Sequence, residues 1–308
     1  MPRPVLIDTD MGVDDAVALS LAVCAETLDL RWIATVGGNV SAAQAAENVG
    51  RCLAALQPDR MPDVACGFDP AADEGPVAEA VFGADGLGEV DLPVLSGWVP
   101  RAGLALYEEA ARGDERLIVV TLGPLTNLAR LLKAKGAPLT QIERIVIMAG
   151  AVFAPGNVTP KVEFNIHRDP EAAAAVLDSG LPITLVPLDA TRNVVFDESH
   201  VAHLAASNTR PGQMLARMIE YPLARQNDAP PGQFLVHDAV AMAVLLWPEL
   251  FLQTQMALRV VTEGPDRGRT APATGRKDTP RVSVILSVQV AELLENMLTL
   301  LCHEKFVV

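Results

Sequence analysis

The sequence predicts an α/β protein, with a single domain built on a mainly parallel central sheet that is flanked by helices. Short apolar segments alternate along the chain with segments of helical periodicity, the pattern of parallel strands joined by crossover helices. The chain has 308 residues and 50% of them are hydrophobic, so one large core can form. No low-complexity linker or internal repeat divides residues 1–308. Ligands of open α/β sheets bind where the strands end, so we expect the active site at the carboxyl ends of the strands.

The expected elements follow in order from the first strand. The apolar segment Val5-Leu6-Ile7 leads into acidic residues and is a short buried strand, and residues 13–25 then have helical periodicity. Later apolar segments predict strands at 31–36, 117–121, 144–148, 183–188, 258–262 and 282–288. Helical periodicity predicts helices at 41–56, after Gly123-Pro124 to about residue 132, at 170–178, over most of 197–247, and at 289–302.

Two segments are predicted to form lid loops. The segment near 66–98 is rich in Gly, Pro and Asp and has little regular signal. The segment near 221–236 contains a proline-rich interruption of the helical pattern. Long irregular loops in compact domains are commonly active-site lids, so we expect both to lie over the site.

The composition excludes several classes of partner. The formal net charge is −14 and no basic run appears, which argues against binding to nucleic acid. No segment approaches the roughly 20 apolar residues of a membrane span, and the first residues lack the apolar stretch of a signal peptide. The four cysteines form no Cys-x-x-Cys pair, which favours a reducing compartment. We expect a cytoplasmic protein with neither membrane nor nucleic acid as its partner.

The strongest local signal is the acidic stretch Asp8–Asp15, with four carboxylates at the end of the first strand. Like charges this close are costly unless a cation or hydrogen-bond donors neutralise them. Asp14 and Asp15 open a helix, so the helix dipole alone could account for one or two of the acids but not for all four. The stretch offers oxygen ligands without a nearby His or Cys, which favours calcium or magnesium and disfavours zinc.

Two weaker signals lie further along the chain. His237-Asp238 directly precedes a helix, where an aspartate is often only a cap and a histidine only a surface residue. Glu163-Phe164-Asn165, with Asn157 upstream, has the side chains that would hold sugar hydroxyls, although it would also suit an ordinary strand end.

Taken in order, these motifs resemble the inosine–uridine preferring nucleoside hydrolase family. The resemblance spans nearly the whole chain from residue 5 to the final helix, and the opening motif D-T-D-M-G-V-D-D-A-V-A-L is its most specific part. The later motifs are Gly37-Gly38-Asn39, Gly123–Asn127, Val162–Asn165 with Asp169–Ala172, and Val236-His237-Asp238. The resemblance implies hydrolysis of the N-glycosidic bond of ribonucleosides to free base and ribose. It also implies that the chain assembles as a homodimer or homotetramer.

The resemblance also implies roles for individual residues. It implies a calcium ion held by Asp10, Asp15, Asp238 and the main-chain carbonyl of Leu122. Asp10 would be the general base that activates water, and His237 would lie on the base side and assist the leaving group. Residues that would hold the ribose, or lie near it, are Asp14, Asn39, Asn157, Glu163, Asn165 and Asp238.

One position departs from the family pattern. Many members have His-Gly before Asp-Gly-Leu-Gly in the long loop, whereas this chain has Phe82 in place of the histidine. Phe82 cannot donate a proton, and it could either stack on a nucleobase or pack under the loop. The preferred nucleobase is therefore left open.

Two alternatives compete with the nucleoside hydrolase interpretation. A phosphohydrolase of the haloacid dehalogenase type also has an Asp-x-Asp after its first strand and binds a divalent cation there. We find no convincing later lysine and acidic pair for that class. A non-catalytic nucleoside-binding protein is the second alternative, but simple binding would not need the base Asp10 or His237.

Overall fold

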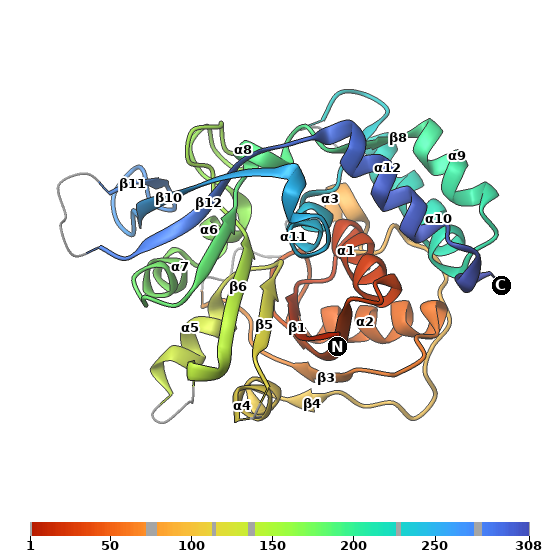
Figure 1. Ribbon diagram of the computed structural model, residues 1–308, viewed down its shortest axis with the longest axis horizontal. Helices are drawn as coiled ribbons and strands as arrows, with labels where there is room; N and C mark the ends of the chain where they lie inside the picture. Colours follow the sequence, from red (N-terminus) through yellow and green to blue (C-terminus); the bar gives the residue numbers. More distant parts are fainter. Residues whose placement is uncertain are drawn as a thin grey trace.

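The computed structural model describes residues 2–71, 79–112, 115–134, 139–225, 229–273 and 279–307. Within these residues a ten-stranded sheet crosses the molecule in the order β11-β10-β12-β7-β6-β5-β1-β2-β3-β4 (Figure 1). Every neighbouring pair from β4 to β12 is parallel, and only β10 pairs antiparallel with its neighbours β12 and β11. The predicted fold class, an α/β domain with a mainly parallel sheet, is confirmed.

The strands of the described residues are β1 (Arg3–Thr9), β2 (Leu28–Thr35), β3 (Asp63–Cys66), β4 (Arg101–Ala102), β5 (Leu117–Thr121), β6 (Ile142–Met148), β7 (Ile183–Val186), β8 (Val195–Asp197), β9 (Gln233–Leu235), β10 (Phe251–Val260), β11 (Thr270–Pro272) and β12 (Arg281–Val288). The α-helices are α1 (Val13–Cys24), α2 (Ala42–Leu56), α3 (Glu79–Phe82), α4 (Ala105–Arg112), α5 (Thr126–Lys133), α6 (Phe164–Arg168), α7 (Pro170–Leu177), α8 (Leu188–Thr191), α9 (Glu198–Ala206), α10 (Arg210–Arg225), α11 (His237–Leu246) and α12 (Val290–Leu301). Strands β8 and β9 form a separate small antiparallel pair.

The long apolar strands and the periodic helices lie close to their predicted bounds. The bounds of short or amphipathic elements differ from the prediction. The prediction for 258–262 was wrong in extent, since β10 begins at Phe251. Much of β10 is exposed or half-buried, so it lacks the continuous apolar signal of the central strands. The region near 66–98 contains α3, and residues 72–78 within it lie outside the described ranges. In the region near 221–236, residues 226–228 lie outside them.

Helices cover both faces of the sheet and create two apolar cores. Helices α1, α2, α10, α11 and α12 contribute to one core, and α4, α5 and α7 to the other (Figure 1). A strand buried on both faces needs apolar residues at every position, and all five residues of β5 are buried. Of the helices within the described ranges, none combines the length and apolarity required to cross a bilayer.

The order of the strands reverses at β1. From β1 the chain adds β2, β3 and β4 on one side, and then returns to add β5 on the other side of β1. Loops that leave neighbouring strands in opposite directions open a crevice at their carboxyl ends, which is where α/β proteins bind ligands. Here that crevice follows Thr9 of β1 and Thr121 of β5, and thus lies beside the acidic stretch.

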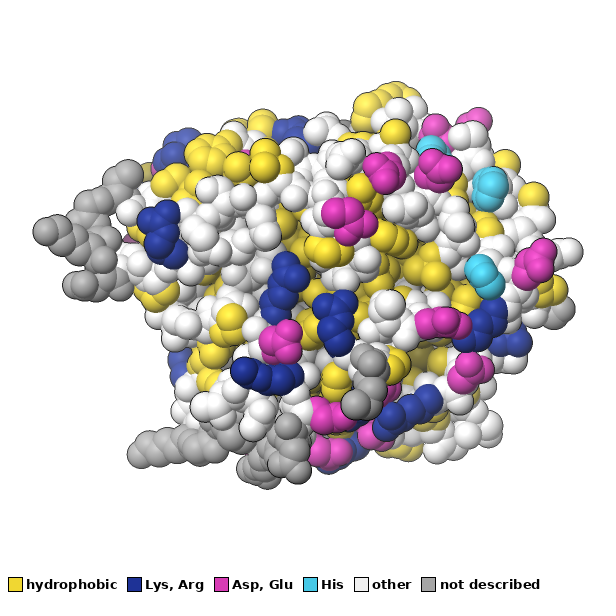
Figure 2. Space-filling model, in the orientation of Figure 1, with side chains coloured by type: hydrophobic (Ala, Val, Ile, Leu, Met, Phe, Trp, Pro, Cys, Tyr) yellow, Lys and Arg dark blue, Asp and Glu magenta, His cyan; other side chains and the backbone are white. Residues whose placement is uncertain are grey.

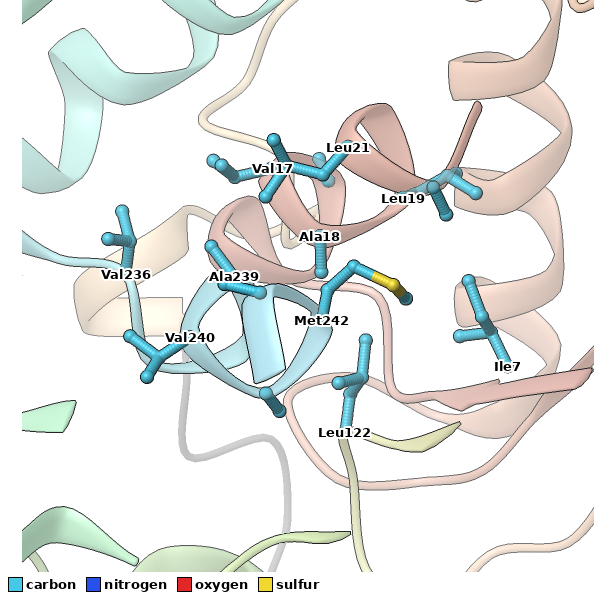
Figure 3. Close-up of a cluster of buried hydrophobic side chains, with 14 of the residues drawn as sticks. Ile7, Val17, Ala18, Leu19, Leu21, Leu122, Val236, Ala239, Val240 and Met242 are labelled. Carbon is cyan, nitrogen blue, oxygen red and sulfur yellow. The ribbon is translucent and has the colours of Figure 1, made fainter. Parts of the chain in front are cut away.

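Two buried helices lead away from this crevice side by side. In Figure 3, Ala18 of α1 and Met242 of α11 face each other, and Leu122 from the end of β5 points towards the same cluster. These three side chains are at most 1% exposed. Because both helices are fixed by apolar packing, the first turns that carry Asp14 and Asp238 are fixed as well.

Because these helices pack closely, truncation of a buried side chain in this core should strongly lower the free energy of unfolding. Leu21→Ala in α1 should lower the free energy of unfolding by about 2–5 kcal/mol, because Leu21 is completely buried and its loss leaves a cavity. The matched control Leu252→Ala, at a side chain that is 61% exposed in β10, should change it by less than about 0.5 kcal/mol. Urea denaturation of the three proteins measures both values, and equal losses would contradict the proposed role of this core.

Candidate active and metal site

Three aspartates converge at the helix N-termini beside β1. Asp14 and Asp15 lie in the first turn of α1, and Asp238 lies in the first turn of α11. One carboxylate oxygen from each lies within 4.8 Å of the others, and all three side chains are buried. The positive ends of two helix dipoles thus face the cluster and favour negative charge there.

The Asp15 carboxylate is held by donors from two loops. The Thr9 hydroxyl donates to one oxygen, and the Gly12 backbone amide donates to the other at 2.7 Å. The Asn39 side chain adds a longer contact of 3.4 Å from the loop after β2. These donors fix the direction of the carboxylate and leave it facing Asp14 and Asp238.

Asp10 sits next to this cluster in a tightly packed turn. The Asn39 backbone amide donates to Asp10 Oδ2 at 2.7 Å. A Cβ atom at Gly38 would lie 2.0 Å from Asp10 Oδ2, and one at Gly123 would lie 3.0 Å from Asp10 Cγ. Glycine at these two positions therefore leaves the space that the Asp10 carboxylate fills.

The turn after Asp10 is strained. Met11 has φ of 45°, in the left-handed region that a bulky residue rarely adopts, and its side chain is completely buried. Its backbone amide donates to the Thr9 hydroxyl at 3.1 Å. Strain of this kind costs about 1–3 kcal/mol and persists where the surrounding packing imposes it. Here the packing directs Asp10 and Asp15 towards the same crevice.

The four acids strongly disfavour ionisation in the absence of a cation. Burial and neighbouring carboxylates hold the pKa of Asp10, Asp14 and Asp238 well above its usual range. Burial also raises the pKa of Asp15, against the opposing effect of its hydrogen bonds from Thr9 and Gly12. No cationic side chain of the described residues is among the main causes of these shifts. A group of buried carboxylates without a countercharge has the chemistry of a cation site.

A second observation fits the same conclusion. Asp14 Oδ1 is buried and has no hydrogen-bond partner within the described part of the chain. The donor set consists of oxygen atoms, which suits a hard cation such as calcium or magnesium. The Leu122 carbonyl accepts from Asn165 Nδ2 at 2.6 Å, and a carbonyl oxygen has a second lone pair for a cation.

Asp8 does not join the cluster. It accepts hydrogen bonds from the Tyr107 hydroxyl and from Asn127 Nδ2, the latter at 3.1 Å. Those residues lie on α4 and α5, which cover the opposite face of the sheet from α1 and α11. Burial raises the pKa of Asp8 to about 7. Side chains alternate between faces along β1, so Asp8 and Thr9 point to opposite sides of the sheet, and Thr9 contacts the acid cluster whereas Asp8 does not.

Three of the predicted sugar-binding residues, Asn157, Glu163 and Asn165, lie in the segment that follows β6. The Glu163 carboxylate caps α6 and accepts from the backbone amides of Asn165 and Ile166, and also from Gly150 at 2.8 Å. Asn165 Nδ2 links the Leu122 carbonyl to the Met148 carbonyl. Asn157 is exposed and accepts from the Phe164 amide at 2.9 Å. Asn165 is thereby fixed next to the carbonyl of Leu122, and Glu163 next to the amide of Gly150.

His237 precedes Asp238 on α11 and is buried. Its Nδ1 lies 2.7 Å from the Thr191 hydroxyl, which fixes the orientation of the imidazole ring. Phe82 is also buried, and its ring packs edge-on against Phe234 with centroids 6.3 Å apart. A Cβ atom at Gly12 would lie 3.0 Å from the Phe82 ring, so the ring adjoins the turn of the acidic stretch while packing under its loop.

Several residues that shape the site were not singled out by sequence. Thr9 holds Asp15, and Thr191 holds His237. Asp189 accepts from the backbone amides of residues 152–154 and thus fixes the start of the loop that carries Asn157. Asp189 follows the strand that ends at Val186, so a search of every strand end for acids would have found it. The two threonines carry no such signal.

Together these features define an α/β protein with a buried, carboxylate-lined candidate metal site at a reversal of strand order. Comparison with known proteins identifies the class further. Residues 5–295 match the sequence profile of the inosine-uridine preferring nucleoside hydrolases. The probable uridine nucleosidase 2 of Oryza sativa subsp. japonica is 33% identical over 279 residues, which cover 89% of this chain and 82% of that protein. The pyrimidine-specific ribonucleoside hydrolase RihA of Salmonella enteritidis is 33% identical over 270 residues, 86% of each chain.

Solved structures agree with the sequence comparison. The purine-preferring ribonucleoside hydrolase from Gardnerella vaginalis superposes with a TM-score of 0.90 at 29% identity, covering 97% of this chain and 98% of that one. The plant nucleoside hydrolase PpNRh1 superposes with a TM-score of 0.91 at 28% identity, covering 98% and 100%. This chain belongs to the inosine-uridine preferring nucleoside hydrolase family. The predicted enzyme class, an N-glycosidic hydrolase, is confirmed, and the haloacid dehalogenase alternative is wrong.

The buried acids predict how stability depends on pH. The pKa of each is higher in the folded protein than the value of about 3.9 expected for an unfolded chain. The folded state therefore keeps protons that the unfolded state has released, and the melting temperature in chelator should fall as pH rises from about 4 through 7. Calcium bound at these carboxylates would compete with the protons, so the stabilisation that added calcium gives should grow with pH.

Thermal melts at several pH values, with calcium and with chelator, measure both trends. A melting temperature that rises with pH in chelator, or a calcium effect that shrinks with pH, would contradict this account of the site.

Proposed function

We propose that this chain hydrolyses the N-glycosidic bond of ribonucleosides, purine, pyrimidine or both, in a calcium-dependent reaction that yields free base and ribose. The observation that carries the proposal is the buried cluster of Asp14, Asp15 and Asp238 beside Asp10 in a member of this enzyme family. The ligands proposed for calcium are Asp10, Asp15, Asp238 and the Leu122 carbonyl. Bound there, calcium would lower the pKa of a water molecule and neutralise the carboxylates.

Asp10 is the proposed general base. The Asn39 amide orients its carboxylate, and the cation would reverse the upward shift of its pKa so that it can accept a proton from the attacking water. Cleavage leaves positive charge on the ribose ring in an oxocarbenium-like transition state. The surrounding carboxylates favour that charge where it develops.

The ribose is proposed to be held by Asp14, Asn157, Glu163, Asn165 and Asp238, with Asn39 nearby. Several fixed contacts to the sugar convert binding into orientation of the scissile bond. A substrate without the 2′-hydroxyl would leave buried polar groups unpaired, so deoxyribonucleosides should be poor substrates.

His237 is proposed to stabilise the leaving base. Its contact with the Thr191 hydroxyl fixes the ring, and a histidine can supply a proton near neutral pH. Phe82 is proposed to form part of the wall on the base side. Its packing against Phe234 makes it a fixed apolar surface that could not protonate a base, in place of the histidine common in the family.

The base preference cannot be carried over from relatives. One similar protein is described as pyrimidine-specific and another as purine-preferring, at similar identity to this chain. We also propose that the regions near 66–98 and 221–236 act as lids, and that the chain acts in the cytoplasm as a homodimer or homotetramer. The free cysteines Cys24, Cys52, Cys66 and Cys302 suit a reducing compartment.

On the face shown in Figure 2, the described Lys and Arg side chains lie among acidic and apolar ones and do not form a single basic surface. This distribution is consistent with a small-molecule substrate.

The first test is ribose release from inosine, adenosine, guanosine, uridine and cytidine. Asp10→Asn should lower kcat by about 10²–10⁴-fold, because it removes the proposed base but keeps the size of the side chain. The control Asp59→Asn, at an exposed acid outside the site, should leave kcat unchanged. Chelator should abolish the activity and calcium should restore it.

The outcomes separate the proposals. Calcium-dependent release that collapses only in Asp10→Asn supports the reaction, and the best substrate reveals the base preference. A folded, calcium-loaded protein that releases ribose from none of these nucleosides, yet binds them, would instead support the non-catalytic alternative.

The second test concerns His237. His237→Gln should lower kcat for natural nucleosides by about 10²-fold or more, because their bases leave poorly without a proton. With p-nitrophenyl riboside the loss should be small, since nitrophenolate is a stable leaving group. Equal losses on both substrates would show that His237 does not act on the leaving group. Comparison of kcat for the two substrates, in the wild type and the variant, measures the difference.

A further inference from the structure

The reaction proposed above leaves Asp8, Tyr107 and Asn127 unused. All three side chains are at most 1% exposed and lie on the face of the sheet opposite α1 and α11. The Asp8 carboxylate accepts from the Tyr107 hydroxyl at one oxygen and from Asn127 Nδ2 at the other. Burying a charged or polar group is costly unless it is paired, so this arrangement is a specific one.

Asn127 also joins two further segments to Asp8. Its Nδ2 donates to the Thr35 carbonyl at 2.9 Å, at the last residue of β2. Its Oδ1 accepts from the Phe68 amide at 3.1 Å, in the loop after β3. A Cβ atom at Gly67 would lie 2.5 Å from both polar atoms of the Asn127 side chain. The amide is therefore enclosed, and it connects the ends of β1 and β2 to the start of the region near 66–98.

This network is adjacent to the backbone that presents the proposed catalytic groups. The Leu122 amide donates to the Asp8 carbonyl at 2.7 Å, and the carbonyl of Leu122 faces Asn165 in the site. The Val36 amide donates to the Thr9 carbonyl at 3.0 Å. Val36 leads directly into Gly37-Gly38-Asn39, whose last amide holds the Asp10 carboxylate. Displacement of β1 against β2 or β5 would thus move three groups of the proposed site: Asp10, the Asn39 amide that donates to it, and the Leu122 carbonyl.

We propose that Asp8, Tyr107 and Asn127 form a positioning network that fixes the ends of β1, β2 and β5 from behind the site and thereby sets the separation of Asp10 from the Leu122 carbonyl. The inference rests on the proposed function, because these two groups matter as base and calcium ligand. It explains why Asp8 and Asn127 occur in two of the motifs that form the site although neither side chain joins the acid cluster.

A purely structural role predicts different behaviour from a positioning role. Residues that orient metal ligands typically change metal affinity or activity by about 10–100-fold when altered. A core hydrogen bond elsewhere in the sheet would change stability without changing either property. Thr184 provides that comparison, because its hydroxyl accepts from Arg144 Nε at 3.0 Å near the amino ends of β6 and β7.

The experiment compares Tyr107→Phe with the matched control Thr184→Val. Each substitution removes one buried hydroxyl and leaves the rest of the residue nearly unchanged in shape. The lost hydrogen bond is to Asp8 of β1 in Tyr107→Phe and to Arg144 of β6 in Thr184→Val. Calcium affinity is measured by titration calorimetry, kcat and KM by ribose release, and backbone protection by hydrogen exchange. Asn127→Ser is a second variant that shortens the amide side chain of the same network.

Tyr107→Phe should weaken calcium binding and lower kcat by about 10-fold or more, with a smaller change in KM. Amides of residues 36–40 and 117–123 should exchange faster. Thr184→Val should lower the melting temperature by a similar amount and leave calcium affinity, kcat and exchange at those residues unchanged.

Wild-type calcium affinity and kcat in both Tyr107→Phe and Asn127→Ser would overturn the inference while the proposed function stands. Equal effects of Tyr107→Phe and Thr184→Val would overturn it too, because the network would then be only part of the core. A wild-type protein that neither binds calcium nor releases ribose would overturn the proposed function and this inference together.

Discussion

The mutual repulsion of buried carboxylates is the constraint on which this structure depends. Asp10, Asp14, Asp15 and Asp238 are all nearly inaccessible to solvent, and neighbouring carboxylates raise the cost of ionising Asp10, Asp14 and Asp238. The fold offsets this cost with two helix N-termini and with donors from Thr9, Gly12 and Asn39. Those donors leave Asp14 Oδ1 without a partner among the described residues, so a cation bound there would complete the arrangement. The apolar contact between α1 and α11 keeps the charges together, because neither helix can withdraw without losing its core.

Strand order explains how so many separate segments reach one point. Because β1 lies between β2 and β5, loops from both neighbours end beside Asp10, and the segment that follows β6 brings in Asn165 from α6. The close packing has local costs that the rest of the fold offsets. Met11 adopts a left-handed conformation, and only glycine fits at Gly38. Sites held by strands and helix starts in this way are more rigid than sites built on loops alone.

The sequence predicted the elements and residues whose signal is local. Apolar runs such as Leu117–Thr121 and the acidic stretch after the first strand are read directly from neighbouring residues. The extent of β10 was not predictable in that way, because a half-exposed strand has a weak apolar pattern. Nor was the separate position of Asp8, whose partner Tyr107 is 99 residues away. Local sequence specifies that an acid ends a strand, but distant packing decides which face of the sheet it serves.

The two sides of the site differ in how strongly the fold constrains them. On the side proposed for ribose and calcium, carboxylates and amides are tied to backbone groups at the end of β5 and at the starts of α1 and α6. A substitution there disturbs several elements at once. On the side proposed for the base, Phe82 packs edge-on against another aromatic ring within the apolar core, and such apolar contacts tolerate replacement by other shapes of similar volume. Base preference can therefore diverge between relatives while the hydrolytic centre stays the same, as the pyrimidine-specific and purine-preferring descriptions of two similar proteins illustrate.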